Sequence, residues 1–336
     1  MKLLVTGGAG FMGSNFIRYI LSKYETYSII NFDKLTYAGN LENLRDVEKD
    51  PRYQFVRGDI CDEQAVLAVM ASGVDAVINY AAETHVDRSL LDPKAFAMTD
   101  VLGALTLLQA VTKCNVPKMI QISTDEVYGS AEKGLFSEDS PFRPTSPYSA
   151  SKAGADHLCQ AYFASFGTPV VVTHSCNVYG PYQFPEKLIP LAITNILDGK
   201  KVPVYGDGLH EREWIHAEDH ARAIDAILHN GKSGETYNIG TGNFLKNIDA
   251  IKMILNLLDK TEDYVEFVTD RPGHDRRYAL AWNKIAQELN WRPKISFQEG
   301  LRMKVLWYKN NEGWWKKIKS GEFSKYYENQ YTNRLT

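Results

Sequence analysis

The chain has 336 residues, which is ordinary for one α/β domain with a smaller attached lobe. Hydrophobic residues make up 44% and charged residues 24%, so the composition is that of a globular protein. The net charge of −3 excludes a broad basic surface for nucleic acid, although a local basic pocket stays compatible with it.

Four cysteines are present, and none belongs to a Cys-x-x-Cys pair: Cys61, Cys114, Cys159 and Cys176. We therefore expect reduced thiols and no metal site. Glycines interrupt the apolar amino terminus after a few residues, unlike a signal peptide. No stretch reaches the ~20 apolar residues that cross a bilayer. We expect a soluble, cytoplasmic protein that binds neither membrane nor nucleic acid.

The first half alternates short apolar runs with amphipathic segments, the pattern of a parallel sheet covered by helices on both faces. The expected strands are Lys2–Thr6, Ser28–Phe32, Tyr53–Arg57, Ala76–Tyr80, Lys118–Ser123 and Val170–His174. The expected helices are Gly10–Ser22, Glu63–Ala71, Pro93–Cys114, Ser149–Phe166 and Pro185–Leu197. This alternation predicts a Rossmann-type, doubly wound parallel sheet.

After about Gly180 the pattern becomes mixed α/β, which indicates a smaller substrate-binding lobe over the carboxyl edge of the sheet. The strands expected there are Val202–Tyr205 and Thr236–Ile239, and the helices are Ala217–His229 and Asn247–Leu258. The expected division is a sheet domain over 1–180, to which segments near 210–230 return, a lobe over 181–320, and a tail over 321–336. This polar and aromatic tail is expected to pack poorly or against a partner.

The first strand runs into a glycine-rich turn that opens the first helix, which is the context of a dinucleotide site. Gly7 permits the tight turn, Gly10 lets the backbone approach a pyrophosphate, and Gly13 allows close packing of helix on strand. An acid, Asp33, ends the second strand about 20 residues later and can accept hydrogen bonds from ribose hydroxyls. Because it would repel a 2′-phosphate, NAD is favoured over NADP.

Tyr148 and Lys152 lie four residues apart, on one face of a predicted helix. A lysine ammonium beside a phenol lowers the pKa of the tyrosine, which makes a base for a sugar hydroxyl. Thr124, at the end of a preceding strand, can hydrogen-bond the reacting hydroxyl. With the glycine loop and Asp33, these residues resemble the extended short-chain dehydrogenase/reductase family over nearly the whole chain.

The run Ser123-Thr124-Asp125-Glu126-Val127-Tyr128-Gly129 narrows this resemblance, because it places two carboxylates after the strand that ends in Thr124. It is similar to the Asp-Glu signature of the dTDP-glucose 4,6-dehydratases. Three further segments share the resemblance: 81–89, 179–190 and 271–278.

The resemblance implies oxidation at carbon 4 of an NDP-glucose, loss of water across carbons 5 and 6, and return of the hydride to carbon 6. Tyr148 is then the base at carbon 4, Glu126 takes the proton of carbon 5, and Asp125 protonates the departing hydroxyl. The product is an NDP-4-keto-6-deoxyglucose, as in the biosynthesis of deoxysugars such as rhamnose.

The resemblance also assigns binding residues. Those expected to hold NAD are Gly7, Gly10, Phe11, Met12, Gly13, Asp33, Asp59, Ile60, Ala81, Tyr148 and Lys152. Those expected to hold the nucleotide sugar are His85, Thr124, Asn177, Glu186, Lys187, Leu188, Tyr205, Arg212, Asn247, Arg271, His274 and Tyr278. Among the latter, Arg212, Asn247 and Arg271 are expected to contact the diphosphate and Tyr205 to stack on a pyrimidine.

Several positions depart from the family pattern. His174 stands where arginine is common, Val178 and Asp100 stand where asparagine is frequent, and the segment 212–217 departs from Arg-Asp-Trp. These departures leave thymine and uracil open as the base.

Three other readings stay open: a UDP-sugar 4-epimerase or decarboxylase of the same fold, a dehydratase of UDP-glucose, and an inactive NAD-binding scaffold. The family's usual homodimer forms through the helix of Tyr148 and its neighbour. Small apolar residues on that helix are compatible with such a contact: Ala150, Ala153, Ala155, Leu158 and Ala161.

Overall fold

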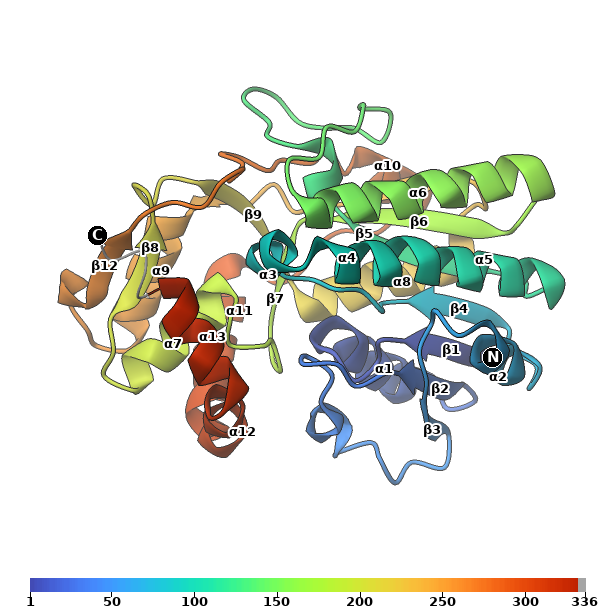
Figure 1. Ribbon diagram of the computed structural model, residues 1–336, viewed down its shortest axis with the longest axis horizontal. Helices are drawn as coiled ribbons and strands as arrows, with labels where there is room; N and C mark the ends of the chain where they lie inside the picture. Colours follow the sequence, from blue (N-terminus) through green and yellow to red (C-terminus); the bar gives the residue numbers. More distant parts are fainter. Residues whose placement is uncertain (332–336) are drawn as a thin grey trace.

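The structure is a computed structural model that describes residues 1–331. Its centre is a seven-stranded sheet of order β10-β6-β5-β4-β1-β2-β3 in which every pair is parallel (Figure 1). The strands are β1 (Lys2–Thr6), β2 (Ser28–Asp33), β3 (Tyr53–Arg57), β4 (Ala76–Asn79), β5 (Met119–Thr124), β6 (Val170–Ser175) and β10 (Thr236–Ile239). The predicted doubly wound Rossmann-type fold is confirmed.

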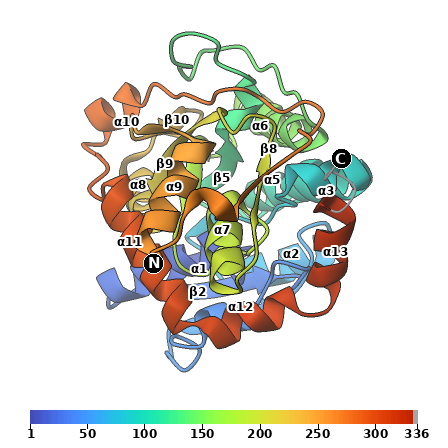
Figure 2. The same cartoon turned by 90° about the vertical axis from the view of Figure 1, so that its left-hand side faces the viewer.

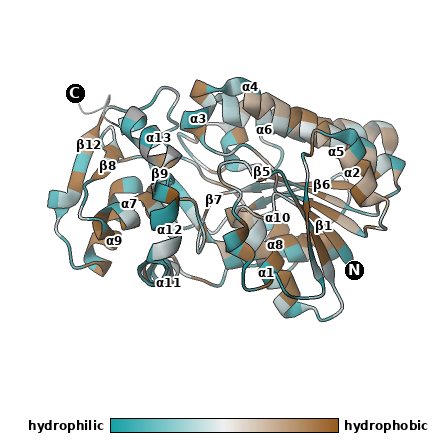
Figure 3. Ribbon diagram, turned by 60° about the horizontal axis from the view of Figure 1, so that its bottom comes forward, coloured by the Kyte–Doolittle hydropathy of each residue, from teal (hydrophilic) through white to brown (hydrophobic). Residues whose placement is uncertain are grey.

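Helices cover both faces of this sheet. One face packs against α1 (Phe11–Lys23), α8 (Ala217–Asn230) and α10 (Asn283–Glu288). The other packs against α2 (Glu63–Met70), α5 (Gly103–Lys113) and α6 (Pro147–Phe166). Figure 3 shows the strands between these two layers, coloured mostly as hydrophobic.

Strand β1 shows why the sheet needs both layers. Leu3 and Val5 point into the core under α1 and α8, whereas Leu4 points into the core under α2 and α5. Alternate side chains of a strand point to opposite faces, so a continuous apolar strand is stable only when both faces are covered.

The second lobe contains two small sheets. One has order β11-β9-β7, with β7 (Asn177–Tyr179), β9 (Glu211–His216) and β11 (Phe244–Lys246), and the other pairs β8 (Val202–Tyr205) with β12 (Val265–Val268). Its helices are α7 (Leu188–Leu197), α9 (Asn247–Leu257), α11 (Phe297–Asn310), α12 (Glu312–Lys319) and α13 (Glu322–Tyr331). Figure 2 faces this lobe and shows α11, α12 and α13 running around its outside. Its own core includes Ile193, Val204, Ile251 and Trp315.

Short elements connect the rest of the described chain. They are η1 (Leu41–Leu44), α3 (Val86–Leu91), α4 (Pro93–Phe96), the π-helical turn η2 (Ala97–Leu102), η3 (Asp125–Tyr128) and η4 (Glu262–Tyr264). The helix expected over 93–114 is therefore interrupted by a π turn, a feature that often marks functional sites.

Two expectations about the second half need correction. β10 pairs with β6 and completes the main sheet, so this strand is not part of the lobe. Residues Glu322–Tyr331 of the expected tail form α13, whose Phe323 is buried and whose Tyr326 and Tyr331 contact His85 and Tyr205; residues 332–336 lie outside the described chain. Phe323 also contacts Phe184, and Tyr327 accepts a hydrogen bond from Asn195, so aromatic side chains hold this helix against the rest of the protein.

The stretch Pro93–Lys113 is long and apolar enough, by length and composition, to cross a membrane. It is not a continuous apolar run, however, because Lys94, Asp100 and Gln109 lie within it. Half of the stretch is buried inside the protein, where α5 packs against α2 and α6. The core helix of a soluble protein passes the same test.

Candidate active site

The glycine-rich turn joins β1 to α1 and leaves the first amides of the helix free. Gly7 has a φ of 65°, and a Cβ at Gly13 would lie 2.5 Å from the carbonyl oxygen of Gly7. Both positions therefore require glycine, for the turn and for close packing. Helix α1 begins at Gly10 without a side-chain cap, so its amides are available to an anion.

Asp33, at the end of β2, is buried and accepts hydrogen bonds from the backbone amides of Ala9 and Leu35 at 2.9 and 2.8 Å. Burial raises the pKa of this carboxyl, which those two amides oppose. The adjacent Lys34 is paired with Asp59 at 2.6 Å. The carboxylate of Asp59 thus neutralises the cation that follows Asp33 in the sequence, and the buried Asp33 carboxyl itself disfavours a 2′-phosphate.

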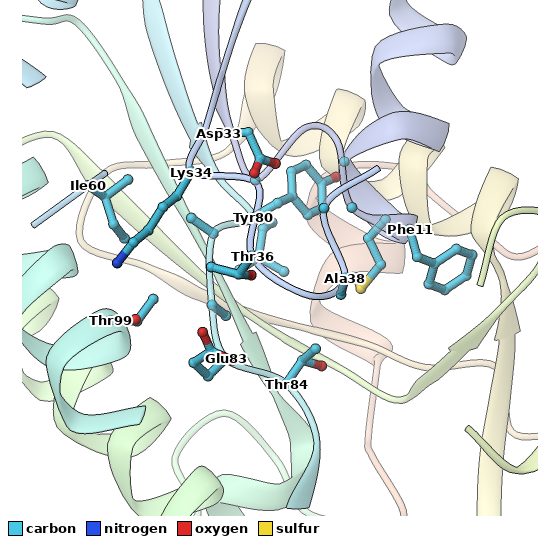
Figure 4. Close-up of a pocket in the computed structure, with 18 of the residues that line it drawn as sticks. Phe11, Asp33, Lys34, Thr36, Ala38, Ile60, Tyr80, Glu83, Thr84 and Thr99 are labelled. Carbon is cyan, nitrogen blue, oxygen red and sulfur yellow. The ribbon is translucent and has the colours of Figure 1, made fainter. Parts of the chain in front are cut away.

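A cavity of about 1230 Å³ extends from the glycine turn to α6. Every residue expected to hold NAD lines it, namely Gly7, Gly10, Phe11, Met12, Gly13, Asp33, Asp59, Ile60, Ala81, Tyr148 and Lys152. The structure adds lining residues that were not predicted, among them Lys34, Thr36, Glu83, Thr84 and Thr99 (Figure 4). Glu83 and Thr84 lie inside the segment 81–89 that carried the family resemblance, so that segment could have indicated them.

The predicted catalytic residues converge at the carboxyl end of β5. Thr124 ends the strand, Asp125 and Glu126 open η3, and Tyr148 and Lys152 come from α6. The Tyr148 hydroxyl is hydrogen-bonded to the Thr124 side chain, and Lys152 Nζ donates to the carbonyl oxygen of Ile122 at 2.6 Å.

The electrostatics of Tyr148 differ from the expectation. Burial, followed by the charges of Glu126 and Asp100, holds the pKa of Tyr148 well above its usual value. The expected lowering by Lys152 is wrong for the protein alone, because buried acids surround the phenol. The hydrogen bond from Thr124 acts in the opposite direction and favours the phenolate.

The two adjacent carboxyls differ in their surroundings. Burial raises the pKa of Asp125 well above its usual value, the acids Glu126 and Glu213 raise it further, and its Oδ2 has no partner among residues 1–331. Burial also raises the pKa of Glu126, but three cations oppose this shift: Arg271, Lys187 and Arg212. Asp125 is therefore suited to the role of an acid and Glu126 to that of a base.

A second cavity, of about 980 Å³, lies between Glu126 and the lobe. It is lined by the expected substrate residues other than Thr124, namely His85, Asn177, Glu186, Lys187, Leu188, Tyr205, Arg212, Asn247, Arg271, His274 and Tyr278. Gln183, Glu186 and Lys187 line both cavities, so the two share a wall.

Polar atoms in the second cavity lack partners. Asn177 Oδ1, Asn247 Oδ1, Arg271 Nε and Trp214 Nε1 are buried and make no hydrogen bond within the described chain. Buried polar groups in native proteins are ordinarily hydrogen-bonded, so these atoms indicate a polar ligand. Lys187 and Arg271 add positive charge, which favours an anionic one.

The rim of the second cavity involves α13, which the sequence did not indicate. Tyr331 lines the cavity and stacks on Tyr205, with ring centroids 6.0 Å apart. Tyr205 also donates from its hydroxyl to Asp87 at 2.8 Å. One face of Tyr205, expected to stack on a pyrimidine, is thus already covered by a residue of this chain.

Arg88 connects this rim to the first cavity. Its guanidinium lies 3.8 Å from the ring of Tyr37 and 4.2 Å from the ring of Tyr326, on α13. It also pairs with Glu186 at 2.9 Å, and Tyr37 donates to the same carboxylate at 2.8 Å. We call Tyr37, Arg88, Glu186 and Tyr326 the Arg88 clamp.

The departures from the family pattern lie in different surroundings. His174 is buried in the core, where its ring nitrogens lie 2.6 Å from the Tyr128 hydroxyl and 3.1 Å from Asp156. Glu213, within β9, accepts from the backbone amides of Thr241 and Gly242 and holds the turn after β10. Val178 lines the second cavity, whereas His174 and Glu213 do not.

A Rossmann-type sheet with a free helix amino terminus, a tyrosine–lysine pair and an adjoining cationic cavity defines an extended short-chain dehydrogenase/reductase that acts on a nucleotide sugar. Comparisons with known proteins support this class. The family model described as GDP-mannose 4,6 dehydratase matches residues 4–304. The chain is 46% identical to dTDP-glucose 4,6-dehydratase 1 of Escherichia coli K12 over a 361-residue alignment that covers 99% of this chain and all of that protein.

Solved structures agree. The dTDP-glucose 4,6-dehydratase DesIV of Streptomyces venezuelae, crystallised with NAD and TYD, matches with a TM-score of 0.92 and 48% identity over 95% of this chain and 100% of that one. A UDP-glucose 4-epimerase of Thermotoga maritima matches with a TM-score of 0.86 but 29% identity over 93% of this chain and 100% of that one. The chain belongs to the dTDP-glucose 4,6-dehydratase family.

Proposed function

We propose that this protein converts dTDP-glucose to dTDP-4-keto-6-deoxyglucose and water, with NAD as a cofactor that is regenerated in each turnover. The observation that carries the proposal is the Asp125–Glu126 pair. Glu126 lines the second cavity, Asp125 is buried beside it, and the different electrostatic surroundings of the two carboxyls suit an acid and a base. Full-length similarity to dTDP-glucose 4,6-dehydratases supports the same substrate.

The residues fit NAD and a nucleotide diphosphate. Uncapped amides at the start of α1 suit the pyrophosphate, and Asp33 suits the ribose hydroxyls. NAD supplies the acceptor for the hydride of carbon 4 and its donor to carbon 6. On the other side, Arg271, Lys187 and the unpartnered asparagine oxygens suit the diphosphate and sugar.

The chain's own groups perform the proton transfers. Tyr148, oriented by Thr124, takes the proton of the 4-hydroxyl as carbon 4 is oxidised. The ketone acidifies the carbon 5 proton, which Glu126 removes. Asp125 gives its proton to the 6-hydroxyl, which leaves as water. As the hydride returns to carbon 6, carbon 5 takes back a proton from Glu126. The reaction is redox-neutral overall, because the hydride lost at carbon 4 is regained at carbon 6.

The test is an incubation with dTDP-glucose, followed by alkali-induced absorbance of a 4-keto sugar, with UDP-glucose in parallel. We expect product from dTDP-glucose and much less from UDP-glucose. Absence of a 4-keto product from both sugars would reject the proposal. A 4-epimerase would instead interconvert glucose and galactose nucleotides, a reaction that does not need the Asp125–Glu126 pair.

We further propose a cytoplasmic homodimer that serves deoxysugar biosynthesis, as for rhamnose, without contact to membrane or nucleic acid. In this proposal residues 1–180 and the returning segments hold NAD, and the lobe holds the nucleotide sugar.

Ala153 and Ala155 are buried inside the monomer, so they do not bear on the dimer. Phe163 and Phe166 of α6 are 39% and 64% exposed and supply an apolar contact. Sedimentation of Phe166→Asp against native protein tests it.

A further inference from the structure

Asp100 is a buried acid beside the catalytic helix that the mechanism above does not use. It belongs to the π turn η2 and is 2% exposed. Its Oδ2 accepts from Ser151 Oγ at 2.7 Å, and its Oδ1 accepts from the backbone amide of Glu83 at 3.1 Å. The carboxylate therefore joins α6, between Tyr148 and Lys152, to the loop that lines the cofactor cavity.

The segment that carries Asp100 faces the reacting phenol directly. Phe96, four residues earlier, meets the ring of Tyr148 edge-on at a centroid distance of 6.1 Å. The hydroxyl of Ser151, which contacts Asp100, also lies 2.8 Å from the carbonyl oxygen of Tyr148. A substitution of Asp100 therefore affects Tyr148 in two ways: through the contacts of the Ser151 side chain and through the loss of the Asp100 charge.

The charge of Asp100 acts on several groups. Burial raises the pKa of Asp100 itself to about 6, and the Lys152 ammonium opposes this shift. Its negative charge raises the pKa of Tyr148, after burial and Glu126. The titratable groups that face it from the elements packed around it are Tyr148, Lys152 and Asp156 on α6, Glu83 after β4, and Cys61 after β3.

We propose that Asp100 is a positioning residue that sets the pH range in which Tyr148 accepts a proton. A buried negative charge near a phenol disfavours the phenolate, and it offsets the Lys152 ammonium that favours it. Both effects raise the pH at which half of the Tyr148 side chains are ionised. An asparagine at this position keeps the shape and the acceptor for the Glu83 amide but carries no charge.

The inference rests on the proposed function for its kinetic readout, so a second readout is independent of turnover. In Asp100→Asn, the acid limb of the kcat/KM profile should move to lower pH by about one unit, the scale of one nearby charge. Without substrate, the phenolate absorbance that disappears in Tyr148→Phe should show the same downward shift of its midpoint. Asp100→Ser, smaller and neutral, should shift it in the same direction.

Ser151→Ala is the matched control, since it removes the hydrogen bond and keeps the charge. It should lower kcat while the phenolate midpoint stays near its native value. Equal midpoints in native protein, Asp100→Asn and Asp100→Ser would overturn the inference and leave Asp100 a structural tether. A native protein inactive on dTDP-glucose would reject the proposed function alone, because the absorbance titration would still decide the role of Asp100.

Discussion

Replacing Glu126 with glutamine separates the oxidation step from the loss of water. The substitution keeps the shape of the side chain, and Tyr278, whose hydroxyl lies 3.3 Å from Glu126 Oε2, can still donate to an amide oxygen. The three nearby cations lose one counter-charge but keep their other partners, such as Asp87 for Arg271. We therefore expect a folded protein that binds dTDP-glucose at least as well as the native one.

The expected cost in turnover follows from the lost base. A positioned general base contributes about 10²–10⁴-fold, or about 3–5 kcal/mol of barrier. Lys152 and the cofactor cavity are untouched, and loss of the Glu126 charge removes one cause of the raised pKa of Tyr148, so oxidation at carbon 4 should proceed. The barrier increase should fall on the removal of the carbon 5 proton alone.

Single turnover in deuterated solvent measures this directly. In Glu126→Gln, absorbance of the reduced cofactor should appear on mixing and decay slowly, and carbon 5 should not exchange. In Asp125→Asn, release of water should be slow while exchange at carbon 5 stays measurable. Glu132→Gln, the same change at an exposed position just after η3, is the matched control and should behave as native. If Glu126→Gln and Asp125→Asn both released product at the native rate, the two carboxyls would have only a structural role.

Three further outcomes are expected. Tyr148→Phe should lower turnover about 10²–10⁴-fold with NAD binding retained, and a near-native rate would remove Tyr148 from the mechanism. Native protein should bind NAD far better than NADP in calorimetric titration, and Asp33→Ala should narrow the gap; equal native affinities would contradict this. Burial lowers the pKa of His220 to about 3, below its ordinary 6.5, so the unfolded chain binds more protons between these values and stability falls as pH falls from about 6.5. Urea unfolding at pH 7 and 5 should therefore show a smaller acid loss in His220→Gln than in native protein, whereas the exposed His157→Gln should match native protein.

The parallel sheet could be predicted closely because its strands are short apolar runs bounded by polar turns. β1, β3, β8 and β10 have the predicted bounds, and each of the other predicted strands differs by one residue at one or both ends. The expected site residues are brought together because loops after parallel strands meet at one edge of the sheet. Thus residues as distant as Gly13, Glu126 and Tyr278 line neighbouring cavities.

Other features depend on tertiary contacts that a local pattern does not carry. The local pattern predicts that β10 is a strand. Its pairing with β6, however, depends on the packing of α8 and α10 against the sheet. The stacking of Tyr331 on Tyr205 joins positions more than 120 residues apart and has no motif. The raised pKa of Tyr148 depends on Glu126 and Asp100, which approach it only in the folded protein.

The Arg88 clamp has a consequence for how the two cavities depend on each other. Its members come from the loop after β2, from α3, from the start of the lobe and from α13. Tyr326 lies on the same helix as Tyr331, which lines the rim of the second cavity. A displacement of α13 would therefore loosen the clamp and open the second cavity together, so this one helix couples the cofactor side of the protein to the substrate side.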